Sequence, residues 1–251
     1  MRKTSAICML PLIAHLLSCQ TADDNPPAKV VCLLFDFSES TNFEKTRKIY
    51  ADNFRAILSK INPGDEVTAA TITEMSVAEP ELIVKSAFEV FHPTSDNLFI
   101  KRAEQDDFEN KIKAAKDSLC LAVDSALMNT TRKIMRTDIM SSLHVAERIF
   151  KASHRPKKIL VIMSDMIEDS ESYNFEKDDL SSQRIDQISE MEKQRGRTPD
   201  LTGVKIYAIG ATAKSKEKFF RIRDFWLNYF HSCGADLANE NYGSTLVGFE
   251  E

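Results

Sequence analysis

The chain has 251 residues, of which 43% are hydrophobic and 28% are charged, a balance typical of one globular α/β domain with small additions. Its formal net charge of −5 argues against a protein that binds the phosphate backbone of nucleic acids. With only 7 glycines and 8 prolines, the chain also has little room for low-complexity sequence.

The N-terminal part has the pattern of a targeting segment followed by a linker. A basic start and an apolar run at 6–17, too short to cross a bilayer, are typical of a signal peptide. The stretch LLSC at 16–19 resembles the lipobox of bacterial lipoproteins, which implies acylation of Cys19. We therefore predict a signal peptide at 1–18, a lipid-anchored tether at 19–28, and secretion across the inner membrane to the bacterial envelope. The destination would be the outer membrane if the source is diderm. The alternative is a plain signal peptide in which Cys19 is incidental.

The rest of the chain alternates apolar runs with amphipathic helical patterns. The predicted strands are 30–35, 66–73, 81–91, 157–165, 204–210 and 244–249, and the predicted helices are 41–61, 106–131, 139–152, 180–193 and 214–232. Strands that alternate with helices predict a three-layer, doubly wound α/β fold with a mostly parallel central sheet. The short link between the second and third strands predicts one antiparallel edge strand. We expect the long helix at 106–131 to lie on the sheet; a seam for a partner helix is the alternative.

Two of the apolar strands end in an aspartate. Asp36 and Asp165 should meet at the carboxyl edge of the sheet, where ligands of such folds collect. Asp36 also begins an Asp-x-Ser-x-Ser pattern with Ser38 and Ser40. Carboxylate and hydroxyl oxygens without a thiol or imidazole suit a hard cation such as Mg²⁺, Mn²⁺ or Ca²⁺. The alternative is a chance triplet whose last residues only cap the next helix.

Several stretches resemble one known family. The segment LLFDFSES resembles the first loop of the metal-ion-dependent adhesion site of von Willebrand factor type A domains. Four further stretches resemble that family in the right order: INPGDEVTAATIT at 61–73, TDIMSSLHVAERIF at 137–150, KKILVIMSDMIED at 157–169 and VKIYAIGA at 204–211. The resemblance implies a type A domain at 29–251. It further implies metal ligation by Ser38, Ser40 and Thr137, with Asp36 and Asp165 acting directly or through water.

The same resemblance implies a function without catalysis. In that family a carboxylate of a protein partner often completes the shell of the ion, so we predict an extracytoplasmic, metal-dependent adhesion or assembly module. Mg²⁺ is the first expectation, with Mn²⁺ or Ca²⁺ as alternatives, and nucleic acid is not an expected partner. The chain departs from the family at Arg136 and Met166, where glycine is usual.

Two rival functions stay open. One is a Mg²⁺-dependent phosphohydrolase with Asp36 as nucleophile, although Ser38 stands where such an enzyme needs a second acid. The other is a type A scaffold without a working metal site. We expect the remaining acids near this edge to be solvated rather than ligands; they are Glu39, Asp138, Glu168 and Asp169.

Overall fold

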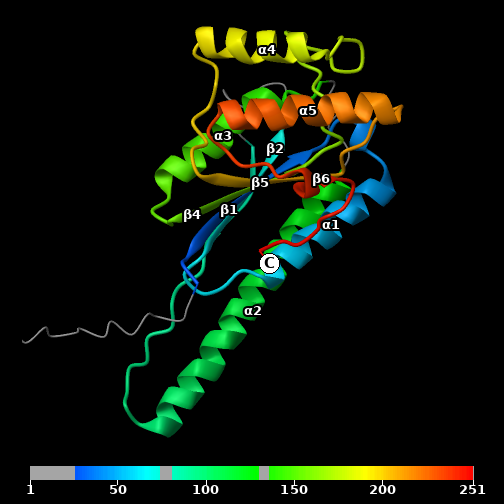
Figure 1. Ribbon diagram of the computed structural model, residues 1–251. Coiled ribbons are helices and arrows are strands. Elements are labelled where there is room, and N and C mark those ends of the chain that lie inside the picture. Colours follow the sequence, from blue (N-terminus) through cyan, green and yellow to red (C-terminus); the bar gives the residue numbers. More distant parts are fainter. Residues whose placement is uncertain (1–25, 74–80, 130–135, 251) are drawn as a thin grey trace, which may run out of the picture.

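A mixed β-sheet forms the centre of the computed structural model, which describes residues 26–73, 81–129 and 136–250 (Figure 1). Its strands are β1 (Lys29–Asp36), β2 (Glu66–Ile72), β3 (Leu82–Ala87), β4 (Lys157–Met163), β5 (Val204–Ile209) and β6 (Tyr242–Gly243). They lie in the order β3-β2-β1-β4-β5-β6. All neighbours pair in parallel except β2 and β3, which are antiparallel. The predicted sheet with one antiparallel edge is confirmed.

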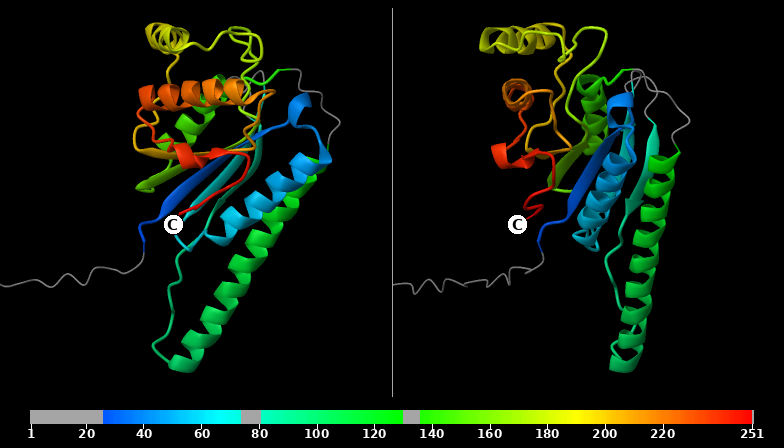
Figure 2. Two further views of the ribbon diagram at one scale, coloured as in Figure 1. Left: turned by 45° about the vertical axis from the view of Figure 1, so that its right-hand side comes forward. Right: turned by 90° about the vertical axis from the view of Figure 1, so that its right-hand side faces the viewer.

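Helices cover both faces of the sheet and make the three layers. They are α1 (Glu44–Ser59), α2 (Leu98–Met128), α3 (Ile139–Ala152), α4 (Ser182–Gln194) and α5 (Lys216–Ser232). Figures 1 and 2 show α1 and α2 together on one face, α3 and α5 on the other, and α4 outside α5. Side chains of β1 alternate between the two cores: Val31, Leu33 and Phe35 face the first layer, and Val30, Cys32 and Leu34 face the second. A central strand that is apolar throughout is the result.

The strand order reverses at β1. The chain leaves β1 toward β2 and β3 on one side, and it returns to β4, β5 and β6 on the other. In open parallel sheets such a reversal opens a crevice beyond the carboxyl ends of the two strands that flank it. Asp36 ends β1 and Asp165 follows β4, so both predicted acids lie at this point.

Three elements differ most from the sequence prediction. Strand β3 ends at Ala87, four residues before the predicted end at 91. The last strand is Tyr242–Gly243, and the predicted strand at 244–249 is irregular, because β5 pairs with the residues just before it. Helix α2 begins at Leu98, eight residues before the predicted start. Only its C-terminal part, with Val123 and Leu127 fully buried, lies on the sheet as expected. No helix in the described part of the chain combines the length and apolar character that a bilayer crossing requires.

Gly210, directly after β5, fixes the distance between β5 and the carboxyl edge of β4. Its φ is +94°, and a Cβ built there would lie 3.0 Å from the Ser164 carbonyl oxygen and 3.0 Å from the Tyr50 hydroxyl. Any larger residue would therefore combine backbone strain with a collision against backbone atoms.

We predict that Gly210→Ala destabilises the protein more than Gly203→Ala does. Gly203 also has a positive φ, +74°, but has no neighbour within 4 Å of its Cβ position. Gly203→Ala should cost about 1–2 kcal/mol of unfolding free energy through strain alone, and Gly210→Ala about 1–3 kcal/mol more through overpacking. Urea unfolding of the two variants measures the difference. Equal losses would mean that the close approach to Ser164 has no energetic weight.

Candidate metal centre

Asp36 is held at the end of β1 with its carboxylate fully buried. One carboxylate oxygen accepts the backbone N–H of Ser38 at 2.8 Å, and the other accepts the hydroxyl of Ser164 at 2.7 Å. Burial raises the pKa of Asp36, while the hydrogen bonds from Ser164 and Ser38 act in the opposite direction. The acid is therefore fixed in orientation by two strand ends that are far apart in the sequence.

The Asp-x-Ser-x-Ser pattern turns back on itself after the strand. Thr41 donates its hydroxyl to the carbonyl oxygens of Asp36, at 2.8 Å, and Ser38, at 3.1 Å. This turn brings the Ser38 and Ser40 hydroxyls to 3.0 Å from each other. Ser38 is buried and Ser40 is exposed, so the pair leads from the buried acid out to solvent.

Asp165 faces this loop from the end of β4. Its carboxylate accepts the backbone N–H of Ile167 at 2.9 Å, and a hydrogen bond from the Ser40 hydroxyl lowers its pKa. Burial and the nearby charge of Asp36 act more strongly and raise that pKa to about 6. The effect of the Asp36 charge on Asp165 indicates that the two acids lie close together in space.

No ion pair reaches either acid in the described part of the chain. The charge of Arg47 lowers the pKa of Asp36. Its guanidinium, however, donates to the Leu127 carbonyl oxygen and to Asn42, each at 2.9 Å. Within the described ranges, the two buried carboxylates thus lack the paired cation that buried charges normally have.

Thr137 lies on the neighbouring loop. It is buried, and its backbone exchanges two hydrogen bonds with Asp169, at 3.1 and 2.9 Å, which ties the segment before α3 to the loop after β4. Among the described residues, no hydrogen bond joins its hydroxyl to the other four predicted ligands. The structure therefore links Asp36, Ser38, Ser40 and Asp165 directly, and places Thr137 beside the loop that carries Asp165.

The two departures from the family pattern have different consequences. Met166 has a φ of +65°, the left-handed region that favours glycine, and its side chain is fully buried. Its backbone is held by Ser164, whose hydroxyl accepts the Met166 N–H at 3.0 Å, and by Trp226, which donates its indole N–H to the Met166 carbonyl at 2.9 Å. Arg136 is exposed, and it is not among the charges that most affect the pKa of Asp36 or Asp165.

Sequence reasoning missed two residues of this region. Ser164 joins Asp36 to the loop after β4. The only feature of the sequence that pointed to Ser164 is its position between a buried strand and Asp165. Tyr50 is fully buried, and its hydroxyl has no hydrogen-bond partner among the described residues. Burial raises its pKa, and the charges of both aspartates raise it further.

Glu168 corrects another prediction. It was expected to be a solvated acid, but it is fully buried and caps α3 by accepting the N–H groups of Ile139 at 2.9 Å and Met140 at 3.2 Å. Burial raises its pKa well above the ordinary value. A helix N-terminus is a favourable place for a carboxylate, which explains why the acid lies inside the protein.

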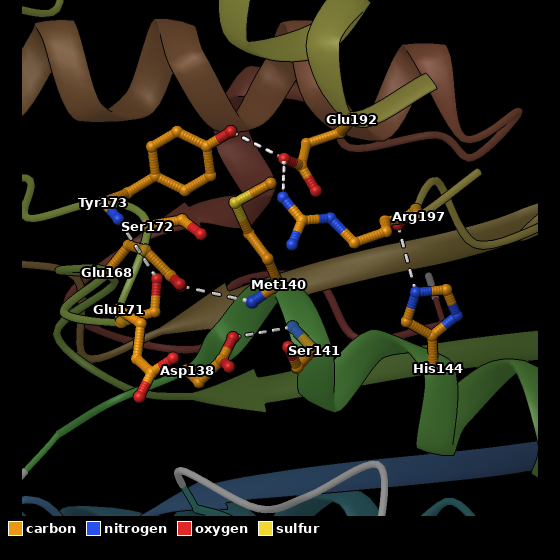
Figure 3. Close-up of a pocket in the computed structure, with 11 residues that line it drawn as sticks. Asp138, Met140, Ser141, His144, Glu168, Glu171, Ser172, Tyr173, Glu192 and Arg197 are labelled. Atoms are coloured by element: carbon orange, nitrogen blue, oxygen red, sulfur yellow. Dashed lines mark hydrogen bonds and ion pairs between the residues drawn. The ribbon is translucent and has the colours of Figure 1, made fainter. Parts of the chain in front are cut away.

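A cavity of about 320 Å³ opens beside Glu168, between α3 and the loop after β4 (Figure 3). On its far side Glu192 accepts hydrogen bonds from Tyr173 and Arg197, both at 2.6 Å. These contacts tie α4 to the loop that carries Asp165. The cavity is thus a neighbour of the candidate centre and contains none of the five predicted ligands.

The donor set of the candidate centre consists of hard oxygens only. It combines two carboxylates with serine and threonine hydroxyls, the ligands preferred by Mg²⁺, Mn²⁺ and Ca²⁺. Among the described residues there is no group of three or more His, Cys, Asp or Glu side chains placed to hold a metal ion. A cation here would depend on the hydroxyls as much as on the acids.

Comparison with known proteins finds solved structures with a similar fold. No family model matches the chain, and no curated protein matches it. Proximal thread matrix protein 1 from the mussel byssus is 16% identical to this chain, with a TM-score of 0.43. The match covers 78% of this chain and 39% of that chain. A second structure of the mussel protein has a zinc-occupied MIDAS motif. Manganese-loaded TRAP protein from Plasmodium vivax is 12% identical with a TM-score of 0.42 over 87% of this chain and 68% of that chain. An aerotolerance-related membrane protein from Bacteroides fragilis is 10% identical with a TM-score of 0.41 over 85% of this chain and 93% of that chain. This chain therefore spans about two fifths of the length of the mussel protein.

We predict that the metal-free protein loses stability as pH rises from about 4 to about 6. The folded state binds a proton at Asp165 more tightly than the unfolded state does, so the contribution of Asp165 to the unfolding free energy is full below about pH 4 and is lost as Asp165 ionises, by at most roughly 3 kcal/mol. Urea unfolding in the presence of chelator, at several pH values, measures this slope. Asp165→Asn should flatten it, whereas Glu39→Gln, a change at an exposed acid of the first loop, should not. The same slope in wild type and Asp165→Asn would contradict the assignment.

We predict that Glu168→Ala and Glu168→Gln differ sharply. The alanine leaves two buried N–H groups of α3 without an acceptor and should cost about 2–4 kcal/mol. The glutamine keeps a carbonyl oxygen for the cap, so its unfolding free energy should stay within about 1 kcal/mol of wild type. Denaturant unfolding at pH 7 distinguishes the two. A large loss for Glu168→Gln would show that the carboxylate makes a contact that an amide cannot make.

Proposed function

We propose that the protein binds one divalent cation at the carboxyl edge of its sheet and, through that ion, a carboxylate of a protein partner. The observation that supports it best is the pair of buried acids, Asp36 and Asp165, joined through Ser38 and Ser40 and lacking a basic partner in the described chain. A bound dication would remove the repulsion between the two acids and favour their ionised forms.

The predicted ligands would contribute to such an ion in two different ways. Ser38, Ser40 and Thr137 supply neutral hydroxyl oxygens, while Asp36 and Asp165 supply charge directly or through water. Because three of the five ligands are neutral hydroxyls, an ion that holds Asp36 or Asp165 through water would keep positive charge that can attract a further carboxylate. Ser40 is exposed, so a partner can approach from its side. Mg²⁺ is the ion we propose first, since it favours hard oxygens and retains water positions that a partner can replace.

The proposal is binding without catalysis. A phosphohydrolase with Asp36 as nucleophile needs a second acid placed to protonate the leaving group. Ser38 stands two residues after Asp36, and its hydroxyl lies against Ser40. Asp36 itself is fully buried and already accepts two hydrogen bonds, which suits an acid that supports an ion better than one that attacks a substrate.

We further propose that the protein works outside the cytoplasm, held to a bacterial envelope membrane by lipid on Cys19. This part rests on the sequence pattern of the first 28 residues. Residues 1–25 lie outside the described structure, so the predicted signal peptide and most of the tether stay predictions.

We predict that the purified protein binds one Mg²⁺ or Mn²⁺ per chain. Asp36→Asn and Ser38→Ala should each weaken the affinity by about tenfold or more, because each removes an oxygen or a charge from the centre. Ser170→Ala, a matched serine change on the loop after β4, should leave affinity unchanged. Isothermal titration with each ion measures the constants, and Thr137→Ala tests the ligand that hydrogen bonding does not connect to the others.

A second readout tests the open position on the ion. When Mn²⁺ is bound, excess propionate, used as a stand-in for an acidic side chain, should lower the water-proton relaxation by replacing bound water. Metal affinity that ignores both Asp36→Asn and Ser38→Ala would overturn the proposal and leave a scaffold without a working metal site. Normal metal binding without a propionate effect would overturn only the carboxylate bridge.

A further inference from the structure

The N-terminal half of α2 extends beyond the body of the protein. Lys116, in the middle of the helix, donates to the carbonyl oxygen of Ile61 at 2.7 Å, at the end of α1 and level with the amino edge of the parallel strands. Leu98 lies 18 residues before Lys116, which corresponds to about 27 Å of helix. Figures 1 and 2 show this half of α2 projecting away from the sheet, opposite the carboxyl edge.

The projection ends in an ordered apolar tip. Leu98, Phe99 and Ile100 form the first turn of α2, and 79%, 88% and 48% of their surfaces are exposed. Asn97 caps this turn by accepting the N–H groups of Phe99 at 3.0 Å and Ile100 at 3.4 Å. We define Leu98, Phe99 and Ile100 as the α2 tip. Three large apolar side chains on a capped helix end are an unusual use of exposed surface.

Further contacts hold the α2 tip in place from the loop that leads to it. Phe91 packs against Phe108 with ring centroids 5.4 Å apart. The N–H of Thr94 donates to Glu104 at 3.0 Å, and the Thr94 hydroxyl bonds to the same carboxylate. The loop and the first three turns of α2 therefore form one stalk rather than a loose end.

The described chain begins beside the base of this stalk. The carboxylate of Asp65 binds the backbone N–H of Lys29 at 2.8 Å and the Lys29 ammonium at 2.9 Å, and the Asp65 carbonyl oxygen accepts the N–H of Phe88 at 2.9 Å. Lys29 lies ten residues after Cys19, and ten residues span at most about 36 Å when fully extended. The linker from Cys19 and the stalk thus start together and have similar reach.

We infer that the α2 tip inserts into the surface of an anionic membrane, the same membrane to which lipid on Cys19 attaches the chain. This inference rests on the proposed anchoring. Lys101 and Arg102 follow the tip directly and are exposed, so they can meet lipid phosphates while the apolar side chains enter the acyl boundary. The candidate metal centre, at the opposite end of the sheet, then faces away from the membrane toward a partner.

A second copy of the chain is a weaker occupant for the tip. Stable protein interfaces bury about 1,200–2,000 Å² over a matched surface. Three side chains at a convex helix end offer far less than that area. A lipid surface needs no matched shape, only apolar side chains next to basic ones.

Depth-dependent quenching in vesicles tests the inference. The full-length chain carries either Phe99→Trp or Leu121→Trp; Leu121 is a matched control, 70% exposed and on the same helix but past Lys116. Vesicles contain phosphatidylglycerol and brominated lipid. Quenching of the tryptophan at 99 should exceed that at 121 by about threefold or more, because only the tip reaches the acyl region. Trp226, fully buried, contributes the same background to both.

Recovery of the chain with sedimented vesicles separates the tip from the anchor. It is measured for wild type, for Cys19→Ala, and for Leu98→Ser, Phe99→Ser and Ile100→Ser combined. Loss of recovery with Cys19→Ala supports the anchor. Recovery that needs the tip but ignores Cys19 supports the tip and overturns the anchor. Full recovery without quenching at position 99 overturns the tip and keeps the anchor. The tryptophan emission at position 99 is also measured without lipid. A shift that depends on protein concentration would mean that the tip binds a second copy of the chain, and it would also overturn the inference.

Discussion

The candidate centre depends on one constraint: two carboxylates are held near each other inside the protein, and no ion pair from the described residues reaches either of them. Asp36 and Asp165 end neighbouring strands, and the pairing of Phe35 with Met163 in β1 and β4 fixes them at the same edge. Burial raises the pKa of both acids, and the charge of Asp36 raises the pKa of Asp165 further, so the folded state carries an electrostatic cost whenever both are ionised. Much of the local structure serves to hold that arrangement.

The hydrogen bonds that hold this arrangement come from several parts of the fold. Ser164 bonds Asp36 and also accepts the Met166 N–H, so one hydroxyl positions both the acid and the turn that follows Asp165. Trp226 of α5 fixes the carbonyl of the same turn. Together these contacts keep Met166 in a left-handed backbone conformation that costs about 1–2 kcal/mol for a residue with a side chain. The loop after β4 therefore keeps this conformation although the residue is not glycine.

Local patterns were enough to predict much of this. Continuous apolar strands that end in an acid gave the positions of Asp36 and Asp165, and the spacing of Ser38 and Ser40 gave the turn between them. The helix predicted at 139–152 has the observed bounds, because its apolar spacing is regular and Asp138 caps it. Long-range partners could not be read in this way. Glu168 looks like any surface acid in the sequence, since its burial depends on the N-terminus of α3, which reaches it only in the folded chain. The early start of α2 was missed because its first turn is apolar but unburied, so it lacks the periodic pattern of a helix that packs on a core.

The bond between Ser164 and Asp36 also bears on the order in which the molecule folds. It joins residues 128 positions apart, across the seam where the first three strands meet the last three. Contacts of such separation form after local ones, because closing a long loop costs entropy before the contact repays it. The oxygen cluster therefore comes together only when both halves of the sheet have docked. An ion that binds the completed cluster stabilises the finished fold over every partly assembled intermediate.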